Sequence, residues 1–204
     1  MSKRGVFICI EGIDASGKTT QAHQLVKNLR LRGLDALFTS EPSSGEIGKI
    51  IRKHVLNRKK RMSAAVEALL FAADRLEHLE KEIKPALKKG KIVICDRYVY
   101  STMAYQGAAD LDLKWIEKIN QFALIPDMAL FIDVSPEIGI ERMLSKSKKS
   151  VMETLKNQRR VCEVYLKMVN EGLLMRIDGN NSVEVVAAEI LKTVSRFLEC
   201  AHVP

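Results

Sequence analysis

The chain has 204 residues, of which 47% are hydrophobic, and its 33 lysines and arginines outnumber its 25 aspartates and glutamates to give a formal net charge of +8. This length predicts one domain spanning residues 1–204, with a core that buries about 70% of the surface exposed by the unfolded chain. Runs of about 18 apolar residues are absent from the sequence, which argues against a membrane span.

The positive charge balance predicts a polyanionic partner, either a nucleotide or a nucleic acid. The densest basic cluster, residues 58–61, falls between two helical segments, as is typical of a solvated loop. Aromatic residues do not alternate with basic ones as a groove for single-stranded nucleic acid requires, so a nucleotide is favoured. The four cysteines stand singly, without zinc-ligand spacing, and predict reduced thiols in a cytoplasmic protein.

The first predicted element is the apolar strand Val6–Ile10, which leads into a glycine-rich turn and a helix. The turn, residues 12–19, matches the pattern G-x-x-x-x-G-K-[ST] of a phosphate-binding loop, or P-loop. In such a loop backbone N–H groups surround phosphate oxygens, Lys18 reaches the β and γ phosphates, and the Thr19 hydroxyl is able to bind Mg2+. The residues predicted to bind ATP here are Gly12, Ile13, Asp14, Ala15, Ser16, Gly17, Lys18, Thr19 and Thr20.

Strands and helices then alternate to the end of the chain. The predicted strands are short and rich in Val, Ile, Leu and Phe, as expected for strands buried on both faces: Val6–Ile10, Asp35–Thr39, Lys91–Cys95, Ala129–Asp133 and Leu174–Ile177. The predicted helices are Thr19–Arg32, Ile47–Leu56, Met62–Lys89, Leu113–Ala123, Pro136–Lys146, Thr154–Glu171 and Ser182–Leu198. This alternation predicts an α/β fold with a five-stranded, mostly parallel sheet and helices on both faces.

The long helical region Met62–Lys89 has two features of its own. Pro85 is expected to bend or break it, because proline lacks a backbone donor and clashes with the preceding turn. Residues 64–74 are apolar on nearly every side, so this helix requires cover on both faces. In so small a domain a second subunit is the favoured cover, which predicts a homodimer, and a helix wholly inside one chain is the alternative.

The segment Lys91–Asp96 adds a second half to the nucleotide site. It is an apolar strand that ends in a carboxylate, and in this fold class Asp96 lies beside the P-loop, where it is able to hold Mg2+ directly or through water. The guanidinium of Arg97 follows and suits bidentate binding of an acceptor phosphate. A guanine-reading N-K-x-D sequence is absent, which argues against a GTPase switch.

Several segments, taken in order along nearly the whole chain, resemble thymidylate kinases. The most selective is Asp96–Gly107, which is similar to that family's D-R-Y-x-x-S-x-x-A-Y-Q-G run. The other matching segments are 7–21, 39–42 with Ile47, Gly48 and Arg52, 69–75, 126–133 and 177–178. The resemblance implies a P-loop kinase fold with a short lid at about 144–153, and ATP-dependent phosphorylation of dTMP to dTDP in dTTP biosynthesis with Mg2+ as cofactor.

The resemblance also implies a dTMP site. Phe71 would stack on the pyrimidine, Arg75 would address the base edge, and Thr102 or Ser101 would bind the base from the other side. Tyr105 would crowd a ribose 2′-hydroxyl and so favour a deoxynucleotide. The implied dTMP-binding residues are Asp14 at the 3′-hydroxyl, Arg97 at the 5′ phosphate, Glu41, Phe71, Arg75, Ser101, Thr102, Tyr105 and Gln106. Arg142 and Gly179 would flank the adenine of ATP.

Catalysis on this interpretation needs no general base, because the acceptor is already a phosphate oxyanion. Lys18, Arg97 and Mg2+ held by Thr19 and Asp96 would neutralise charge on the transferring group. The chain departs from the family at the catalytic arginine, since the P-loop position is Ala15 and the lid carries no arginine. The hypothesis is that one of the lid lysines replaces it, and the candidates are Lys146, Lys148 and Lys149.

Two alternatives stay open from the sequence. Another P-loop nucleotide kinase would act on UMP, CMP or a deoxynucleoside, and in the last case Glu41 would serve as a base for a neutral hydroxyl. The order Asp96-Arg97-Tyr98, in place of the Glu-Arg-Ser usual in deoxynucleoside kinases, favours a monophosphate acceptor. A non-catalytic protein that binds nucleotide or nucleic acid is the alternative from a different class.

Overall fold

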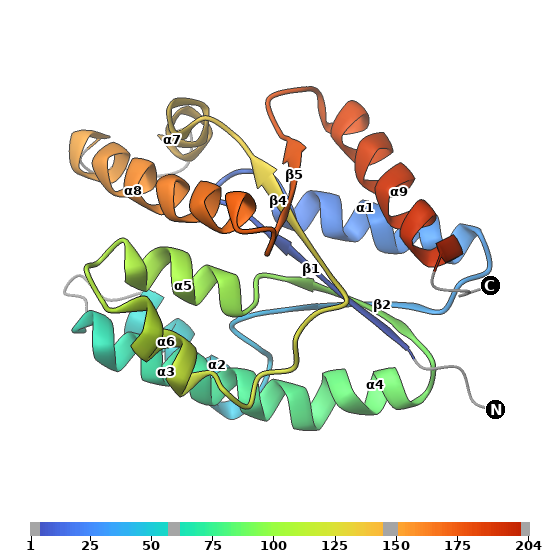
Figure 1. The fold of residues 1–204 in the computed structure, drawn as a ribbon, viewed down its shortest axis with the longest axis horizontal. Helices are drawn as coiled ribbons and strands as arrows, with labels where there is room; N and C mark the ends of the chain where they lie inside the picture. The colour runs from blue at the N-terminus through green and yellow to red at the C-terminus, as the bar shows by residue number, and fades with distance from the viewer. Residues whose placement is uncertain (1–4, 57–61, 145–150, 201–204) are drawn as a thin grey trace.

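The fold is built on a five-stranded parallel sheet, seen in Figure 1 with helices on either side. The computed structural model describes residues 5–56, 62–144 and 151–200. The strands are β1 (Val6–Glu11), β2 (Ala36–Ser40), β3 (Ile92–Asp96), β4 (Met128–Asp133) and β5 (Met175–Asp178). Their order is β2-β3-β1-β4-β5 and every neighbouring pair is parallel. The predicted α/β fold with five strands is therefore confirmed, and β1 lies at its centre.

The helical elements occupy the connections between the strands, and the last of them follows β5. Their bounds are α1 (Lys18–Leu31), α2 (Glu46–Ile51), α3 (Ala64–His78), α4 (Lys84–Lys88), α5 (Val99–Gly107), α6 (Leu113–Ile119), α7 (Pro136–Leu144), α8 (Val151–Asn170) and α9 (Val183–Cys200), with π-helical turns at Arg52–Leu56 and Leu79–Ile83. Helix α8 begins at Val151, so the last residues of the expected lid are helical. The lysines proposed for the lid, at positions 146, 148 and 149, lie outside the described residues.

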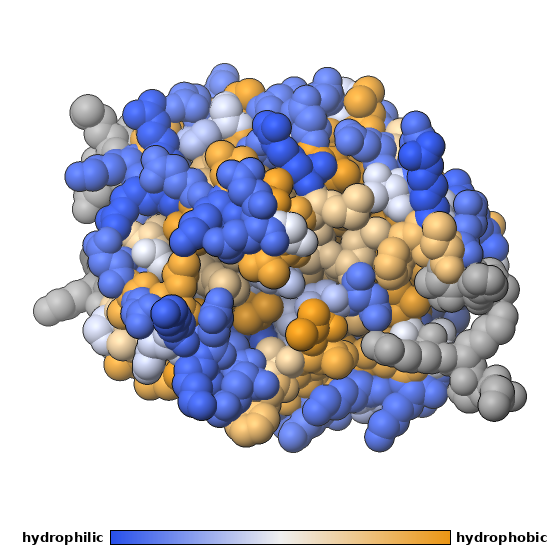
Figure 2. All heavy atoms as spheres, viewed as in Figure 1, coloured by the Kyte–Doolittle hydropathy of each residue, from blue (hydrophilic) through white to orange (hydrophobic). Residues whose placement is uncertain are grey.

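Alternating side chains of the strands form two cores, one on each face of the sheet. Phe7 and Cys9 of β1 face a core shared with α5 and α8, whereas Ile8 and Ile10 face a core shared with α1 and α9. On the side of the molecule shown in Figure 2, polar residues cover most of the surface and apolar residues gather toward the middle. Both faces of the sheet are covered, as the apolar strand sequences require.

Helix α5 is an element that the sequence did not predict. The stretch begins Val99-Tyr-Ser-Thr, and β-branched and aromatic residues favour a helix only weakly. Its formation follows from packing, because Tyr100, Met103 and Ala104 are buried in the core next to β1 and β4. Tertiary contacts here outweigh local propensity, and they bring the Asp96–Gly107 segment into a fixed position beside the P-loop.

The expected break at Pro85 takes a different form in the structure. Proline cannot donate a backbone hydrogen bond to the preceding turn, and the helix accommodates this with the π turn Leu79–Ile83 just before it. Leu79 and Ile83 stay buried across the turn. The chain is therefore helical from α3 through α4, and the irregularity lies ahead of the proline rather than at it.

Helix α3 buries polar residues and exposes apolar ones. Asp74, Arg75 and His78 are buried, whereas the side chains of Val66 and Leu69 are 44% and 50% exposed. The idea of a helix wholly inside one chain is therefore wrong, because one apolar strip of α3 faces outward.

Two further expectations concern membranes and thiols. No helix in the described part of the chain is long and apolar enough to cross a membrane. Cys9, Cys95 and Cys162 are buried free thiols, and burial raises their pKa values, so they act as packing residues.

Candidate active site

The P-loop takes the backbone shape that phosphate binding requires. Gly12 and Gly17 have φ values of 153° and 92°, and Ala15 also has a positive φ of 59°. A Cβ atom on Gly12 would lie 2.6 Å from the Ser16 Oγ atom, so glycine is needed for space as well as for conformation. Gly17 precedes α1 without a side-chain cap, which leaves the first N–H groups of the helix free to bind an anion.

Lys18 folds back over the loop. Its Nζ atom donates to the carbonyl oxygen of Ile13 at 2.6 Å and lies 3.3 Å from the Ser16 Oγ atom. Burial, helped by the nearby Arg97 cation, lowers the pKa of Lys18 to about 7. A bound phosphate would supply the negative charge that this ammonium lacks, so the loop is electrostatically prepared for a polyanion.

Asp96 and Thr19 meet beside the loop, as the strand order predicts. The Thr19 hydroxyl donates to Asp96 Oδ2 at 2.5 Å. The other oxygen of Asp96, Oδ1, is buried and has no hydrogen-bond partner among the described residues. A hydroxyl and an unpaired carboxylate oxygen at the edge of a P-loop are the hard oxygen donors that suit Mg2+.

A cavity of about 280 Å³ opens next to the P-loop. Its lining comes from the P-loop, from the segments after β2 and β3, and from α3 and α5, which are distant in the sequence. The lining residues are Asp14, Glu41, Pro42, Val55, Leu56, Phe71, Arg75, Arg97, Tyr98, Ser101, Thr102, Tyr105 and Gln106. All nine residues that the resemblance implies for dTMP are in this set.

Arg97 and Asp14 join the cavity to the P-loop. Arg97 Nη2 lies 2.6 Å from Asp14 Oδ1, and Arg97 Nη1 approaches Ser101 Oγ at 3.3 Å. Burial alone would raise the pKa of Asp14, but the Arg97 and Lys18 cations outweigh it and lower that pKa. The Tyr105 ring lies under the guanidinium, 5.1 Å from ring centroid to Arg97 Cζ. The ion pair between Arg97 and Asp14 thus lies where the P-loop meets the cavity.

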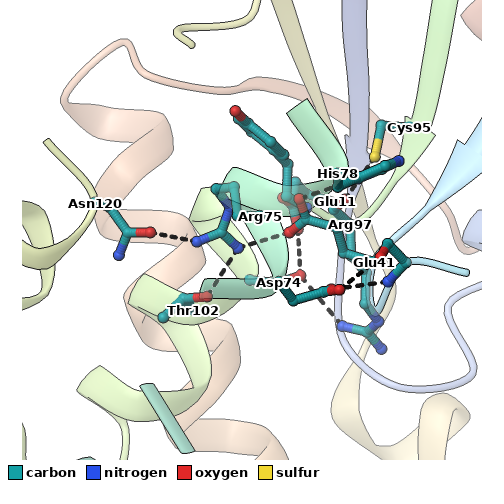
Figure 3. A network of polar contacts seen from close by, with 12 residues as sticks. Glu11, Glu41, Asp74, Arg75, His78, Cys95, Arg97, Thr102 and Asn120 are labelled. Atoms are coloured by element: carbon teal, nitrogen blue, oxygen red, sulfur yellow. Dashed lines mark hydrogen bonds and ion pairs between the residues drawn. The ribbon is translucent and has the colours of Figure 1, made fainter. Parts of the chain in front are cut away.

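Arg75 is fixed in the wall of the cavity and is only 1% exposed. Its Nη2 atom donates to Glu41 Oε2 at 2.7 Å and to Thr102 Oγ1 at 3.1 Å, and its Nη1 atom donates to Asn120 Oδ1 (Figure 3). The guanidinium also lies over the Tyr98 ring. A buried charge needs such partners, and they hold the planar guanidinium of Arg75 in one orientation.

A second buried carboxylate, Glu11, connects three elements. It accepts hydrogen bonds from the Tyr98 backbone N–H at 2.8 Å, from Ser101 Oγ at 2.6 Å and from Tyr165 Oη at 2.9 Å. Burial raises the pKa of Glu11, although these hydrogen bonds oppose the shift. Glu11 therefore ties the end of β1 to α5 and to α8.

Sequence reasoning missed several residues of the site, and two of them, Gln158 and Asn120, hold predicted site residues in place. Gln158 on α8 is buried, donates to Asp14 Oδ2 at 3.0 Å and accepts from the Asp14 backbone N–H at 3.3 Å. Asn120, just after α6, accepts from Arg75 and donates to the Ile116 carbonyl oxygen. Neither residue belongs to a recognisable motif, and the contact of Gln158 spans 144 positions in the chain.

The remaining predicted residues lie on β1, α1, α7 and the turn after β5, or next to them. Ile13 is fully buried, and Thr20 is exposed in the first turn of α1. Arg142 is exposed on α7, and Gly179 follows β5, where its N–H donates to the Asp133 carbonyl oxygen at 2.8 Å. A Cβ atom on Gly179 would come within 2.6 Å of Ile132 and of Val134, so only glycine fits there.

Comparisons with known proteins agree with one another. A family model described as thymidylate kinase matches residues 10–190. A probable thymidylate kinase of Pyrococcus abyssi is 45% identical over 201 residues, which cover 96% of this chain and 98% of that protein. A probable thymidylate kinase of Thermococcus gammatolerans is 42% identical, with 94% and 97% covered, and the thymidylate kinase of Halothermothrix orenii is 37% identical, with 96% and 99% covered. The similarity extends over nearly the whole chain, well beyond the P-loop.

Proposed function

This chain belongs to the thymidylate kinase family, and from that premise we propose that it transfers the γ-phosphoryl group of ATP to dTMP, giving dTDP and ADP for dTTP synthesis. The cavity beside the P-loop carries the proposal, because every residue expected to bind dTMP lines it. Its Asp14 belongs to the P-loop itself, so donor and acceptor sites meet. Both substrates are small nucleotides, and the cytoplasm, where thiols stay reduced, is the proposed location.

The residues that line the cavity support one orientation of the bound acceptor nucleotide. Phe71 and Arg75 form the end that would receive the pyrimidine, and Arg97 and Asp14 form the end next to the P-loop. A 5′ phosphate on Arg97 would then lie close to the γ-phosphate of ATP. The buried Tyr105 hydroxyl has no hydrogen-bond partner among the described residues and would occupy the side on which a ribose carries its 2′-hydroxyl.

Positioning and charge would supply the catalysis. The acceptor oxygen is already anionic, so its in-line attack requires no proton to be removed. Lys18 and Arg97 would neutralise the transferring group and the acceptor phosphate. Thr19 and Asp96 would hold Mg2+, which would supply positive charge to offset the charge developing on the transferring group.

The same contacts argue against the deoxynucleoside alternative. A base for a neutral hydroxyl must offer a free carboxylate oxygen to the substrate. Glu41 instead has Oε2 bound to Arg75 at 2.7 Å and Oε1 facing His78 at 3.4 Å. Its carboxylate is therefore occupied within the wall of the cavity, which supports a monophosphate as the acceptor.

The lid lysines give the first prediction. Because Ala15 supplies no cation, we expect alanine at one of Lys146, Lys148 or Lys149 to lower kcat by about a hundredfold, somewhat less than the loss known for a transition-state arginine. Steady-state kinetics with saturating ATP and dTMP measure the effect. Lys156→Ala, on the exposed side of α8, is the matched control and should keep the wild-type kcat. Unchanged turnover in all three lid variants would show that no lid lysine replaces the arginine.

The second prediction concerns the homodimer that we propose through α3. Val66 and Leu69 lie one turn apart on the exposed strip of this helix, and a partner subunit would cover them. Leu69→Glu should raise the dimer dissociation constant by about a hundredfold or more, because a buried unpaired charge costs several kcal/mol. Analytical ultracentrifugation measures the change, with Val185→Glu on the exposed face of α9 as control. A wild-type chain that is monomeric at micromolar concentration would contradict this proposal.

The proposed function is tested by measuring ADP release with a panel of acceptors, namely dTMP, dUMP, UMP, CMP, AMP and thymidine. The expected result is the highest kcat/KM with dTMP and none with thymidine. Activity with thymidine but not with dTMP would overturn the proposal. ATP binding without release of ADP for any acceptor would instead favour the non-catalytic alternative.

A further inference from the structure

The Arg75 wall of the cavity contains a buried histidine that the proposed phosphoryl transfer does not use. His78, the last residue of α3, is 2% exposed and lies behind Glu41 as seen from Arg75. Its Nδ1 atom faces Glu41 Oε1 at 3.4 Å, while the other Glu41 oxygen receives Arg75 at 2.7 Å. Glu41 thus contacts Arg75 through one oxygen and His78 through the other (Figure 3).

The two ring nitrogens of His78 face different partners. The Thr39 hydroxyl has a single hydrogen, which it donates to Glu82 Oε2 at 2.8 Å, because a carboxylate only accepts. Thr39 Oγ1 also lies 2.6 Å from His78 Nε2 and accepts a hydrogen bond when that nitrogen carries a proton. On the other side, Nδ1 faces a carboxylate oxygen and attracts it only as a donor. The Nδ1 edge of the ring is thus directed at Glu41, and the Nε2 edge is directed at Thr39.

The backbone around His78 holds it in this place. The π turn Leu79–Ile83 follows immediately, and Glu82 within it reaches back to His78 Nε2 at 3.2 Å. Thr39 belongs to the edge strand β2, next to Glu41. The Nε2 edge of the ring thus contacts Thr39 of the sheet and Glu82 of the π turn, and the Nδ1 edge is directed at Glu41.

We propose that His78 is a positioning residue for base recognition: it holds the Glu41 carboxylate, which in turn orients the Arg75 guanidinium toward the pyrimidine. This inference rests on the proposed function. A guanidinium only donates hydrogen bonds, so it matches the O4 acceptor of thymine and repels the N4 amino group of cytosine. The orientation of Arg75 then sets the preference for dTMP over dCMP.

Two substitutions of His78 distinguish the contact made by Nδ1 from the contact made by Nε2. The amide of asparagine reaches the position of Nδ1, and the amide of glutamine reaches the position of Nε2. His78→Asn keeps a donor toward Glu41, and we expect the KM for dTMP and the preference over dCMP to stay within about twofold of wild type. His78→Gln keeps the contact with Thr39 but loses Glu41, and we expect about a tenfold higher KM for dTMP and a tenfold smaller preference, with kcat within about twofold. His23→Gln, on the exposed side of α1, is the control.

The pattern across the two variants decides the inference. A high KM in His78→Gln with a normal KM in His78→Asn supports it, because a purely structural role would affect both variants and kcat together. Equal KM values in both variants, whether raised or normal, overturn it. Melting temperatures measured alongside identify any loss of folding. If the wild-type protein does not phosphorylate dTMP, the proposed function fails, which this comparison distinguishes from failure of the His78 inference.

Discussion

Arg97→Lys is expected to lower kcat/KM for dTMP by about a hundredfold, with most of the loss in KM, because lysine keeps the charge but not the planar fork. The Arg97 guanidinium already divides its donors between Asp14 Oδ1 at 2.6 Å and Ser101 Oγ at 3.3 Å. The acceptor phosphate has to bind to the same guanidinium without breaking its ion pair with Asp14. A single ammonium cannot hold Asp14 and two phosphate oxygens in one plane.

The lysine replacement is chosen so that the backbone is not disturbed. Arg97 has a φ of 70°, and both residues meet the same strain there. Arg159→Lys on α8, whose ion pair with Glu137 lies on the surface, is the matched control and should keep the wild-type kcat/KM. Steady-state kinetics with varied dTMP at saturating ATP give both constants. An Arg97→Lys enzyme with unchanged KM would contradict the assignment of Arg97 to the acceptor phosphate.

Lys18→Met should have the largest effect, a loss of about a thousandfold or more in kcat. The Lys18 ammonium is buried in the loop and bound to the Ile13 carbonyl oxygen at 2.6 Å, within reach of the phosphates that the loop would receive. Ala15 leaves the P-loop without a second cation of its own. Charge that develops on the transferring group would then lose the one cationic side chain within residues 12–19.

The Lys18 variant separates catalysis from binding. Methionine fills a similar volume without the charge, so the fold and the backbone N–H groups of the loop should be preserved. Single-turnover measurements at saturating ATP report the chemical step, and titration with a fluorescent ATP analogue reports binding. Lys27→Met, exposed on α1, is the control. Normal single-turnover rates in Lys18→Met would exclude the lysine from the transfer.

The nucleotide half of the site could be predicted from the sequence because its parts are local. The P-loop lies within residues 12–19, and Asp96 ends an apolar strand, so strand order alone brings Thr19 and Asp96 together. The acceptor residues are scattered from Asp14 to Gln106, and only the resemblance to thymidylate kinases connects them. The structure brings all of them to one cavity.

The parts that the sequence did not predict depend on tertiary contacts. Helix α5 has weak local propensity and forms because its apolar residues are buried against the sheet. Gln158 holds Asp14 across 144 positions, and a lone glutamine on a helix has no pattern that marks it. The π turn before Pro85 is likewise a response of a packed helix to the proline.

The central claim is that the P-loop and the adjoining cavity carry out one direct transfer between two bound nucleotides. Rapid-quench analysis with ATP labelled at its γ phosphate, in the presence of dTMP, tests it most directly. The account predicts that the label appears in the β phosphate of dTDP and that one ADP forms for each dTDP. Label released as free phosphate, with none in dTDP, would contradict it.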